Sequence, residues 1–159
     1  RRTAMLMVAQ GADKGFALCH HLQRGAEVFI AYGVGKDEYY HPQRSMGTLV
    51  CHQRHKMDSD PLADVGGKDI TAHVNFTGSA VAAQDAGFDI LGYTSQGHFL
   101  LNCGFTAKTD ALTLSQRALA GKLVLEHEMG ELFKVLGLCK GVPPWPALGF
   151  AHGDRTHRL

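Results

Sequence analysis

The chain has 159 residues, of which 45% are hydrophobic and 19% are charged, and its formal net charge is +1. This length is sufficient for one domain with a buried core. The composition excludes a collagen, a coiled coil or a disordered chain, and the near-neutral charge excludes a strongly basic face for nucleic acid.

The first half of the chain predicts a helix, a strand and a long irregular segment. Residues 14–24 carry apolar side chains at helical spacing and are followed by Gly25. Residues 27–32 form a short apolar run that favours a buried strand. Residues 33–67 contain repeated turn signals, with only 48–51 predicted as a strand. Long irregular segments in compact domains are usually functional, so this segment is the first candidate for a site.

The second half predicts alternating strands and helices. Residues 69–76 alternate between apolar and polar side chains, which predicts a strand. The remaining elements, in chain order, are a small-residue helix closed by Gly87, a strand over 88–94, helices over 95–103 and 110–121, a short turn or helix over 128–131, a strand over 132–139 and rigid coil from Pro143. The order indicates an α/β chain without internal repeats.

The four cysteines (Cys19, Cys51, Cys103 and Cys139) form no CxxC pair, which excludes a zinc ribbon and a thioredoxin-like motif. We expect free thiols in a reducing, cytoplasmic compartment. The apolar run over residues 4–9 is too short for a membrane span, and it lacks the cleavage site of a signal peptide.

The polar side of residues 69–76 is the first candidate site. Asp69, Thr71, His73 and Asn75 would share one face of the predicted strand. An imidazole beside a carboxylate could act as an acid or base, ligate a metal or hold a substrate. The alternative is an exposed strand face followed by a capping Thr77.

Other motifs give weaker signals. His52-x-x-His55, with His41 and His73 nearby in sequence, suggests a metal site or a metal-dependent hydrolase, but no cysteine has ligand spacing. No GxSxG nucleophile motif is present. Residues 33–35 (Gly-Val-Gly) lack the third glycine of a dinucleotide-binding loop. We rank the metal hypothesis last.

Several blocks of the chain carry a family likeness, and they span residues 38–49, 69–76, 92–101, 128–135 and 149–159. In matching order, these blocks resemble the MidA-like (DUF185) family of S-adenosylmethionine-dependent methyltransferases. The resemblance covers about residues 24–159.

The resemblance implies a class I (Rossmann-like) methyltransferase fold, with a seven-stranded sheet and helices on both faces. Residues 1–159 would be a single C-terminal part of that domain, and the Arg1-Arg2 start would then be truncated. The family's cofactor-binding glycine motif lies in the N-terminal half, and nothing in this chain matches it. We therefore expect S-adenosylmethionine to bind the complete enzyme, and to bind this chain alone weakly or not at all.

The resemblance also implies an activity and partners. The chain would supply the acceptor side of a cleft that methylates a protein side chain, with arginine as the leading candidate, because mitochondrial relatives methylate an arginine during respiratory complex I assembly. We expect an unidentified protein substrate, no nucleic acid, no membrane, and a homo-oligomer as a candidate assembly. The roles implied for individual residues are catalysis by Tyr32, Thr71 and His73, substrate binding by Arg44, Asn75, Phe76 and Gln96, cofactor binding by Gly33, and no metal ligand.

Two positions depart from the family pattern. Ala31 and Asn75 stand where the family has aspartates, and an arginine substrate is held by carboxylates because its guanidinium stays cationic. A catalytically impaired pseudoenzyme or partner-docking module is therefore the alternative. Without the other half of the sheet, the edge beside residues 27–32 is expected to be exposed.

Overall fold

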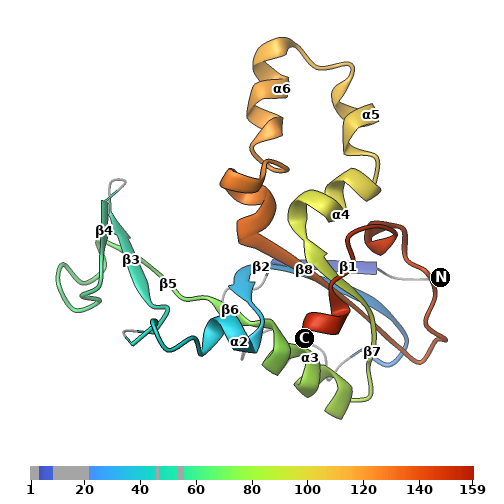
Figure 1. Cartoon of the computed structure of the whole chain (residues 1–159), viewed down its shortest axis with the longest axis horizontal. Coiled ribbons are helices and arrows are strands. Elements are labelled where there is room, and N and C mark those ends of the chain that lie inside the picture. Colours follow the sequence, from blue (N-terminus) through green and yellow to red (C-terminus); the bar gives the residue numbers. More distant parts are fainter. Residues whose placement is uncertain (1–3, 9–21, 46, 54–55) are drawn as a thin grey trace.

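The computed structural model describes residues 4–8, 22–45, 47–53 and 56–159, which form an α/β structure with two sheets (Figure 1). The main sheet has the strand order β1-β2-β8-β7. Its strands are β1 (Ala4–Val8), β2 (Gly25–Val34), β7 (Asp89–Ser95) and β8 (Phe133–Lys140), with the short β6 (Val74–Asn75) paired to the end of β2. The strands predicted over 27–32, 88–94 and 132–139 are thereby confirmed.

Strand direction sets the geometry of one sheet edge. Strand β8 is antiparallel to both of its neighbours, β2 and β7, so those two strands run in the same direction. Strands β1 and β6 are parallel to β2. The carboxyl ends of β2 and β7 therefore lie at the same edge, beside the start of β8.

The predicted exposed edge beside residues 27–32 is wrong. Strand β1 pairs with β2 from Ala26 to Ile30, so β2 lies between two strands. The apolar run at the start of the chain forms this strand, and parallel pairing with β2 satisfies the backbone groups on the side that faces β2.

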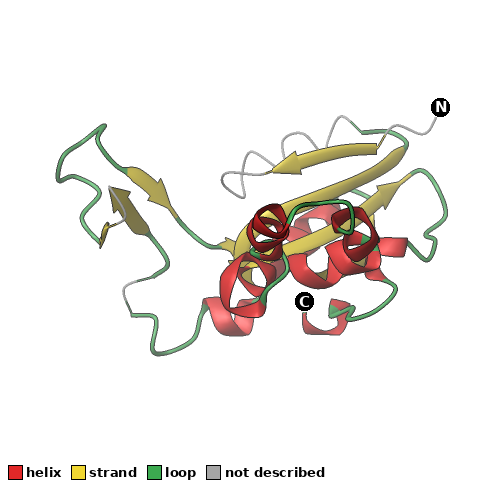
Figure 2. Ribbon diagram, turned by 90° about the horizontal axis from the view of Figure 1, so that it is seen from above, coloured by secondary structure: helices red, strands yellow, loops and turns green. Residues whose placement is uncertain are grey.

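The core lies between the sheet and α3 (Phe76–Asp85). Phe76, Ala80 and Ala83 on this helix are buried against residues of β7 and β8, including Tyr93 and Leu136. The helix begins because Asn75 Oδ1 accepts a hydrogen bond from Gly78 N at 3.0 Å. It is followed by Gly87 with φ +83°, as predicted for its end. Figure 2 shows most of the described helices on one side of the main sheet.

A helical arm follows β7 and projects from the sheet (Figure 1). It consists of α4 (Gln96–Asn102), α5 (Phe105–Thr109), α6 (Leu114–Gly121) and the irregular turn η1 (Glu126–Gly130), in which Glu128 has non-helical backbone angles. The helix predicted over 95–103 is confirmed, and η1 overlaps the turn predicted over 128–131. The helix predicted over 110–121 is shorter because Thr113 caps α6 in a capping box with Gln116.

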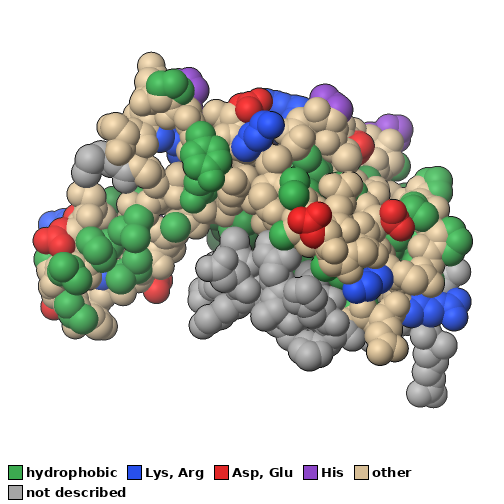
Figure 3. Space-filling view, turned by 90° about the horizontal axis from the view of Figure 1, so that it is seen from below, with side chains coloured by type: hydrophobic (Ala, Val, Ile, Leu, Met, Phe, Trp, Pro, Cys, Tyr) green, Lys and Arg blue, Asp and Glu red, His purple; other side chains and the backbone are tan. Residues whose placement is uncertain are grey.

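The segment between β2 and β6 is more regular than predicted. It contains α2 (Lys36–Tyr39), β3 (Val50–Gln53), β4 (Lys56–Asp58) and β5 (Asp69–Thr71). Strands β4-β3-β5 form a second sheet at one side of the molecule (Figure 1). This lobe exposes apolar side chains, among them Met57, Leu62 and Val65 (Figure 3).

The single strand predicted over 69–76 is wrong. Strand β5 ends at Thr71 and pairs with β3, whereas β6 begins at Val74 and pairs with β2. Phe76 already belongs to α3. The chain leaves one sheet and enters another within two residues, a change of partner that local alternation does not encode.

The segment after Pro143 folds back onto the main sheet. It forms the 3₁₀ turns η2 (Leu148–Phe150) and η3 (Thr156–Arg158), so the prediction of coil alone is wrong. The Phe150 ring lies against Gly92 and Gly137, where any side chain would overlap it. Because Gly92 on β7 and Gly137 on β8 have no side chains, these two adjacent strands leave the space that the Phe150 ring fills.

The helix predicted over 14–24 and Cys19 fall largely outside the described residues. Cys51 and Cys139 are buried and Cys103 is partly buried, and all three are free thiols. In the part of the chain that the structure describes, no helix has both the length and the apolar character needed to cross a membrane.

Candidate active site

The candidate site lies where β2 and β7 end and β8 begins. The pairings at this edge are Tyr32 with Phe133 and Ser95 with Lys134. In open α/β sheets, ligands bind outside the carboxyl ends of parallel strands. The last residues of β2 and β7 are therefore placed where a ligand would be expected.

Tyr32, His73 and Arg44 meet at the end of β2. The Tyr32 and His73 rings lie edge to face, with centroids 4.2 Å apart and planes at 90°. Arg44 Nη1 lies 3.3 Å from His73 Nδ1, and the His73 backbone N–H donates to Thr48 Oγ1 at 3.2 Å. Burial, together with the positive charges of Arg44 and Lys134, lowers the pKa of the His73 imidazole. The structure thus brings together three of the predicted site residues.

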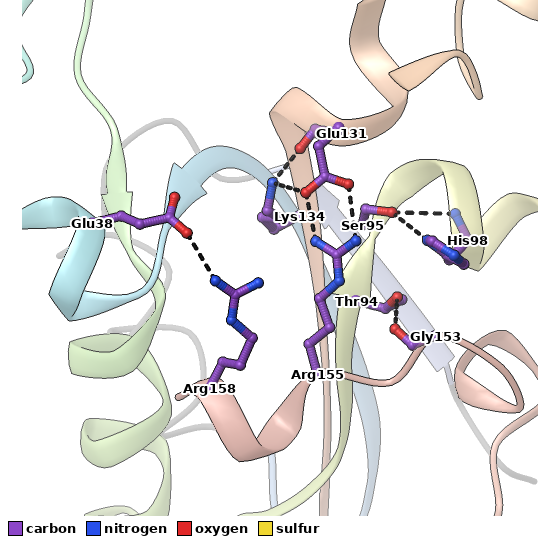
Figure 4. A network of polar contacts seen from close by, with 9 residues as sticks. All are labelled: Glu38, Thr94, Ser95, His98, Glu131, Lys134, Gly153, Arg155 and Arg158. Carbon is purple, nitrogen blue, oxygen red and sulfur yellow. Dashed lines mark hydrogen bonds and ion pairs between the residues drawn. The ribbon is translucent and has the colours of Figure 1, made fainter. Parts of the chain in front are cut away.

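Glu131 binds two cations next to this edge (Figure 4). Arg155 donates from Nη1 to Oε1 at 2.5 Å and from Nη2 to Oε2 at 3.1 Å. Lys134 Nζ lies 3.1 Å from Oε1 and also donates to the Glu131 backbone oxygen. Burial would raise the pKa of the Glu131 carboxyl, but the hydrogen bonds from Arg155 and Lys134 outweigh it, so this pKa lies below its usual value.

A cavity of about 220 Å³ adjoins this cluster. Lys134, Arg155 and Arg158 line one part of it, and Asp37 and Glu38 of α2 line another. Arg158 Nη2 lies 3.3 Å from Glu38 Oε1, which connects the C-terminal segment to α2 (Figure 4). Pockets that enclose a whole ligand usually measure about 300–1,000 Å³. This cavity is therefore smaller than a site that encloses a whole ligand.

The C-terminal segment is fixed to β7 by hydrogen bonds on both sides of Tyr93. The Tyr93 backbone N–H donates to Asp154 Oδ1 at 2.9 Å, and the Arg155 backbone N–H donates to the Tyr93 carbonyl oxygen at 2.6 Å. Thr94 Oγ1 donates to the Gly153 oxygen at 2.6 Å (Figure 4). These contacts place the Arg155 side chain at the site. Burial raises the pKa of the Tyr93 hydroxyl, so this group lines the cavity in its neutral form.

The other predicted site residues have contacts elsewhere. Thr71 Oγ1 donates to the Val50 oxygen in the second sheet, and Gln96 Nε2 donates to the Leu123 oxygen of the helical arm. The side chains of Asn75 and Phe76 cap α3 and pack in the core, as described above. Gly33 lies so close to the Val74 backbone that a side chain would overlap it. The functional roles predicted for these residues remain predictions.

The predicted convergence of four polar residues on one strand face is wrong. Asp69 and Thr71 belong to β5 in the second sheet, whereas Asn75 belongs to β6 and His73 lies between these strands. Only His73 reaches the cluster with Tyr32 and Arg44.

Ala31 and Lys134 occupy directly opposed positions on β2 and β8. Directly opposed residues share a sheet face, so an aspartate at position 31 would lie beside this lysine. In this chain, Lys134 pairs with Glu131 instead.

Sequence reasoning did not assign roles to Lys134, Arg155, Arg158 or Glu38. All four lie inside the blocks that carry the family resemblance. Their placement at one site depends on the insertion of β8 between β2 and β7 and on the return of the C-terminal segment. Neither of these long-range arrangements produces a periodic pattern in the local sequence.

The histidines give no support for a metal centre. Within the described ranges, no group of three His, Cys, Asp or Glu side chains could hold a metal ion. His41 Nδ1 accepts from the Gln43 N–H at 3.3 Å, a local contact, and His55 lies outside the described residues.

The sequence and structure are similar to those of known proteins. A family model described as "Putative S-adenosyl-L-methionine-dependent methyltransferase" matches residues 16–94. No curated protein matches the chain.

Two crystal structures from Burkholderia thailandensis resemble this chain. One is a COG1565 superfamily member and "likely methyl transferase" bound to S-adenosyl-homocysteine, with 45% identity over 93% of this chain and a TM-score of 0.85. The other is an uncharacterized COG1565 superfamily protein with 46% identity over 93% of this chain and a TM-score of 0.84. This chain spans 40% and 41% of their lengths, respectively. The chain is therefore similar to about two fifths of these COG1565-superfamily proteins and shares the α/β fold of that part.

Proposed function

We propose that this chain forms the acceptor side of an S-adenosylmethionine-dependent methyltransferase of the MidA-like (DUF185) kind. The observation that carries the proposal is the 45% identity, over 93% of the chain, to a protein bound to S-adenosyl-homocysteine. The location of the Tyr32, His73 and Arg44 cluster at the carboxyl end of β2 supports it, because ligands of such sheets bind there.

The contribution of this chain is positioning and exclusion of water. Methyl transfer requires the two reacting atoms to be held in line, and S-adenosylmethionine supplies the methyl group when bound. Tyr32 and His73 pack together at the end of β2, whereas Arg155 of the C-terminal segment lines the cavity beside α2. Because the cavity measures only about 220 Å³, we expect the cofactor to require residues beyond those of this cavity.

The proposed acceptor is a protein side chain, with arginine as the first candidate. The Asp37 carboxylate on the cavity wall supports this choice, because a guanidinium is recognised by carboxylates, whereas Glu38 on the same wall already pairs with Arg158. Ala31 lowers the number of carboxylates at this site relative to the family pattern. A cytoplasmic location and assembly into a homo-oligomer stay predictions.

A chimaera tests the proposal. The segment of the S-adenosyl-homocysteine-bound Burkholderia protein that aligns with this chain is replaced by this chain, and transfer of a labelled methyl group to proteins of a desalted lysate is measured. We expect label above that given by a chimaera carrying His73→Ala. A folded chimaera with no more label than its His73→Ala version contradicts the proposal.

A further inference from the structure

The contact between Arg44 and His73 determines which ring nitrogen holds a lone pair. A guanidinium has five N–H donors and no acceptor. Arg44 Nη1 lies 3.3 Å from His73 Nδ1, so Nδ1 must be the acceptor of this hydrogen bond. An imidazole that accepts at Nδ1 is neutral and carries its proton on Nε2.

The surroundings of the ring favour the same form. Tyr32 packs against the imidazole at 4.2 Å, and Thr48 accepts the His73 backbone N–H, which fixes both the ring and the main chain. The charged groups that act on the ring are Arg44 and Lys134, and both are cations. Together with partial burial, they disfavour a second proton on the imidazole.

We propose that Arg44 is a positioning residue that holds His73 as the neutral Nε2–H form, so that His73 donates a hydrogen bond to an oxygen atom of the ligand. This inference rests on the proposed function only for the nature of the reaction in which that ligand takes part. Nδ1 is occupied by Arg44 and Nε2 is protonated, so neither nitrogen is available to remove a proton. His73 is thus a donor, and the general-base role that its residue type suggests is excluded in this state.

This positioning role differs from the role that the family resemblance implies for Arg44, which is substrate binding. If Arg44 acts through His73, a lysine at position 44 keeps a cationic donor and preserves the state of the imidazole. A methionine of similar length removes both the charge and the donor.

Nuclear magnetic resonance of the ¹⁵N-labelled histidine rings tests the assignment on this chain, without cofactor or substrate. His73→Gln identifies the His73 signals. In the unaltered chain we expect Nε2 to carry the proton and Nδ1 to be hydrogen-bonded, with a titration midpoint below about 6.5. Arg44→Met is expected to raise this midpoint by about half a unit or more, and Arg44→Lys to leave it low.

Arg117→Met is the matched control, because it removes the same charge from α6, where Arg117 binds backbone oxygens. Its His73 midpoint is expected to stay unchanged. A proton on Nδ1 in the unaltered chain would overturn the proposal, and this result does not depend on any variant folding. Equal midpoints for Arg44→Met and the unaltered chain would also overturn it.

The chimaera separates this inference from the proposed function. Glutamine places an amide N–H donor near the position of Nε2 but cannot act as a base. We expect His73→Gln to retain methyl transfer within about tenfold and His73→Ala to lose it. Equal loss in both variants would overturn the donor role, whereas a chimaera without transfer but with the expected histidine spectrum would contradict only the proposed function.

Discussion

Glu131 shows how one carboxylate organises this site. It binds Arg155 of the C-terminal segment, 24 residues away in the sequence, and the nearby Lys134 of β8, and so connects the C-terminal segment to the start of β8. Lys134 is 8% exposed and therefore depends on this partner for compensation of its charge.

Replacement of this carboxylate should reduce stability. For Glu131→Gln, we expect the free energy of unfolding near neutral pH to fall by about 1–3 kcal/mol, because two cations lose a charged hydrogen-bond acceptor. Urea unfolding measures the change. Glu126→Gln, at an exposed position on η1, is the control and should stay within about 0.5 kcal/mol of the unaltered chain.

The same residue predicts an acid dependence. The pKa of Glu131 is lower in the folded chain than its usual value, so the stability it contributes is present above about pH 4.3 and is lost as the pH falls through the folded-state pKa. Unfolding curves at several acid pH values should therefore show a smaller loss of stability for Glu131→Gln than for the unaltered chain. If both proteins lose the same amount of stability at acid pH, groups other than Glu131 cause the acid sensitivity.

At the scale of elements, local sequence patterns predicted some elements correctly and divided others wrongly. Apolar runs over residues 27–32 and 132–139, and the glycine after α3, are local signals and gave correct elements. The division of residues 69–76 between two sheets depends on pairing partners distant in the sequence. Alternation of apolar and polar residues indicates only that a strand is favoured, so it could not show where the chain changes from pairing with β3 to pairing with β2.

Asn75 caps α3, so substitutions at this position test whether its role is structural. Its side chain accepts from Gly78 N, so Asn75→Ala should destabilise the chain by about 1 kcal/mol. Aspartate, which the family resemblance places at this position, is an equally good capping residue, and Asn75→Asp should be close to neutral. Thermal or urea unfolding distinguishes the two, and a neutral Asn75→Ala would show that the cap contributes little.

The docking of η2 onto the sheet gives a second prediction at this scale. Phe150 is 8% exposed and fills the space above Gly92 and Gly137, so Phe150→Ala should cost about 3–5 kcal/mol. Leu148→Ala in the same turn removes a side chain that is 67% exposed and should have little effect. Similar losses in the two variants would contradict the packing described for this turn.

For the whole molecule, composition and the strand inventory correctly predicted an α/β fold, but they did not predict the sheet order. The sequence predicted Tyr32, Arg44 and His73 as site residues, and the structure brings them together. The second group, with Glu131, Lys134 and Arg155, forms only when β8 inserts between β2 and β7 and the C-terminal segment returns to β7. Such long-range pairing is a property of the complete fold and has no local pattern.

The central claim is that this chain supplies one part of a cofactor-dependent active site. Isothermal titration with S-adenosyl-homocysteine tests it most directly, on the chain alone and on the chimaera with the Burkholderia protein. The account predicts binding by the chimaera within about tenfold of the parent protein, equivalent to about 1.4 kcal/mol, and weak or no binding by the chain alone. Micromolar binding by these 159 residues alone, or no binding by a folded chimaera, would contradict it.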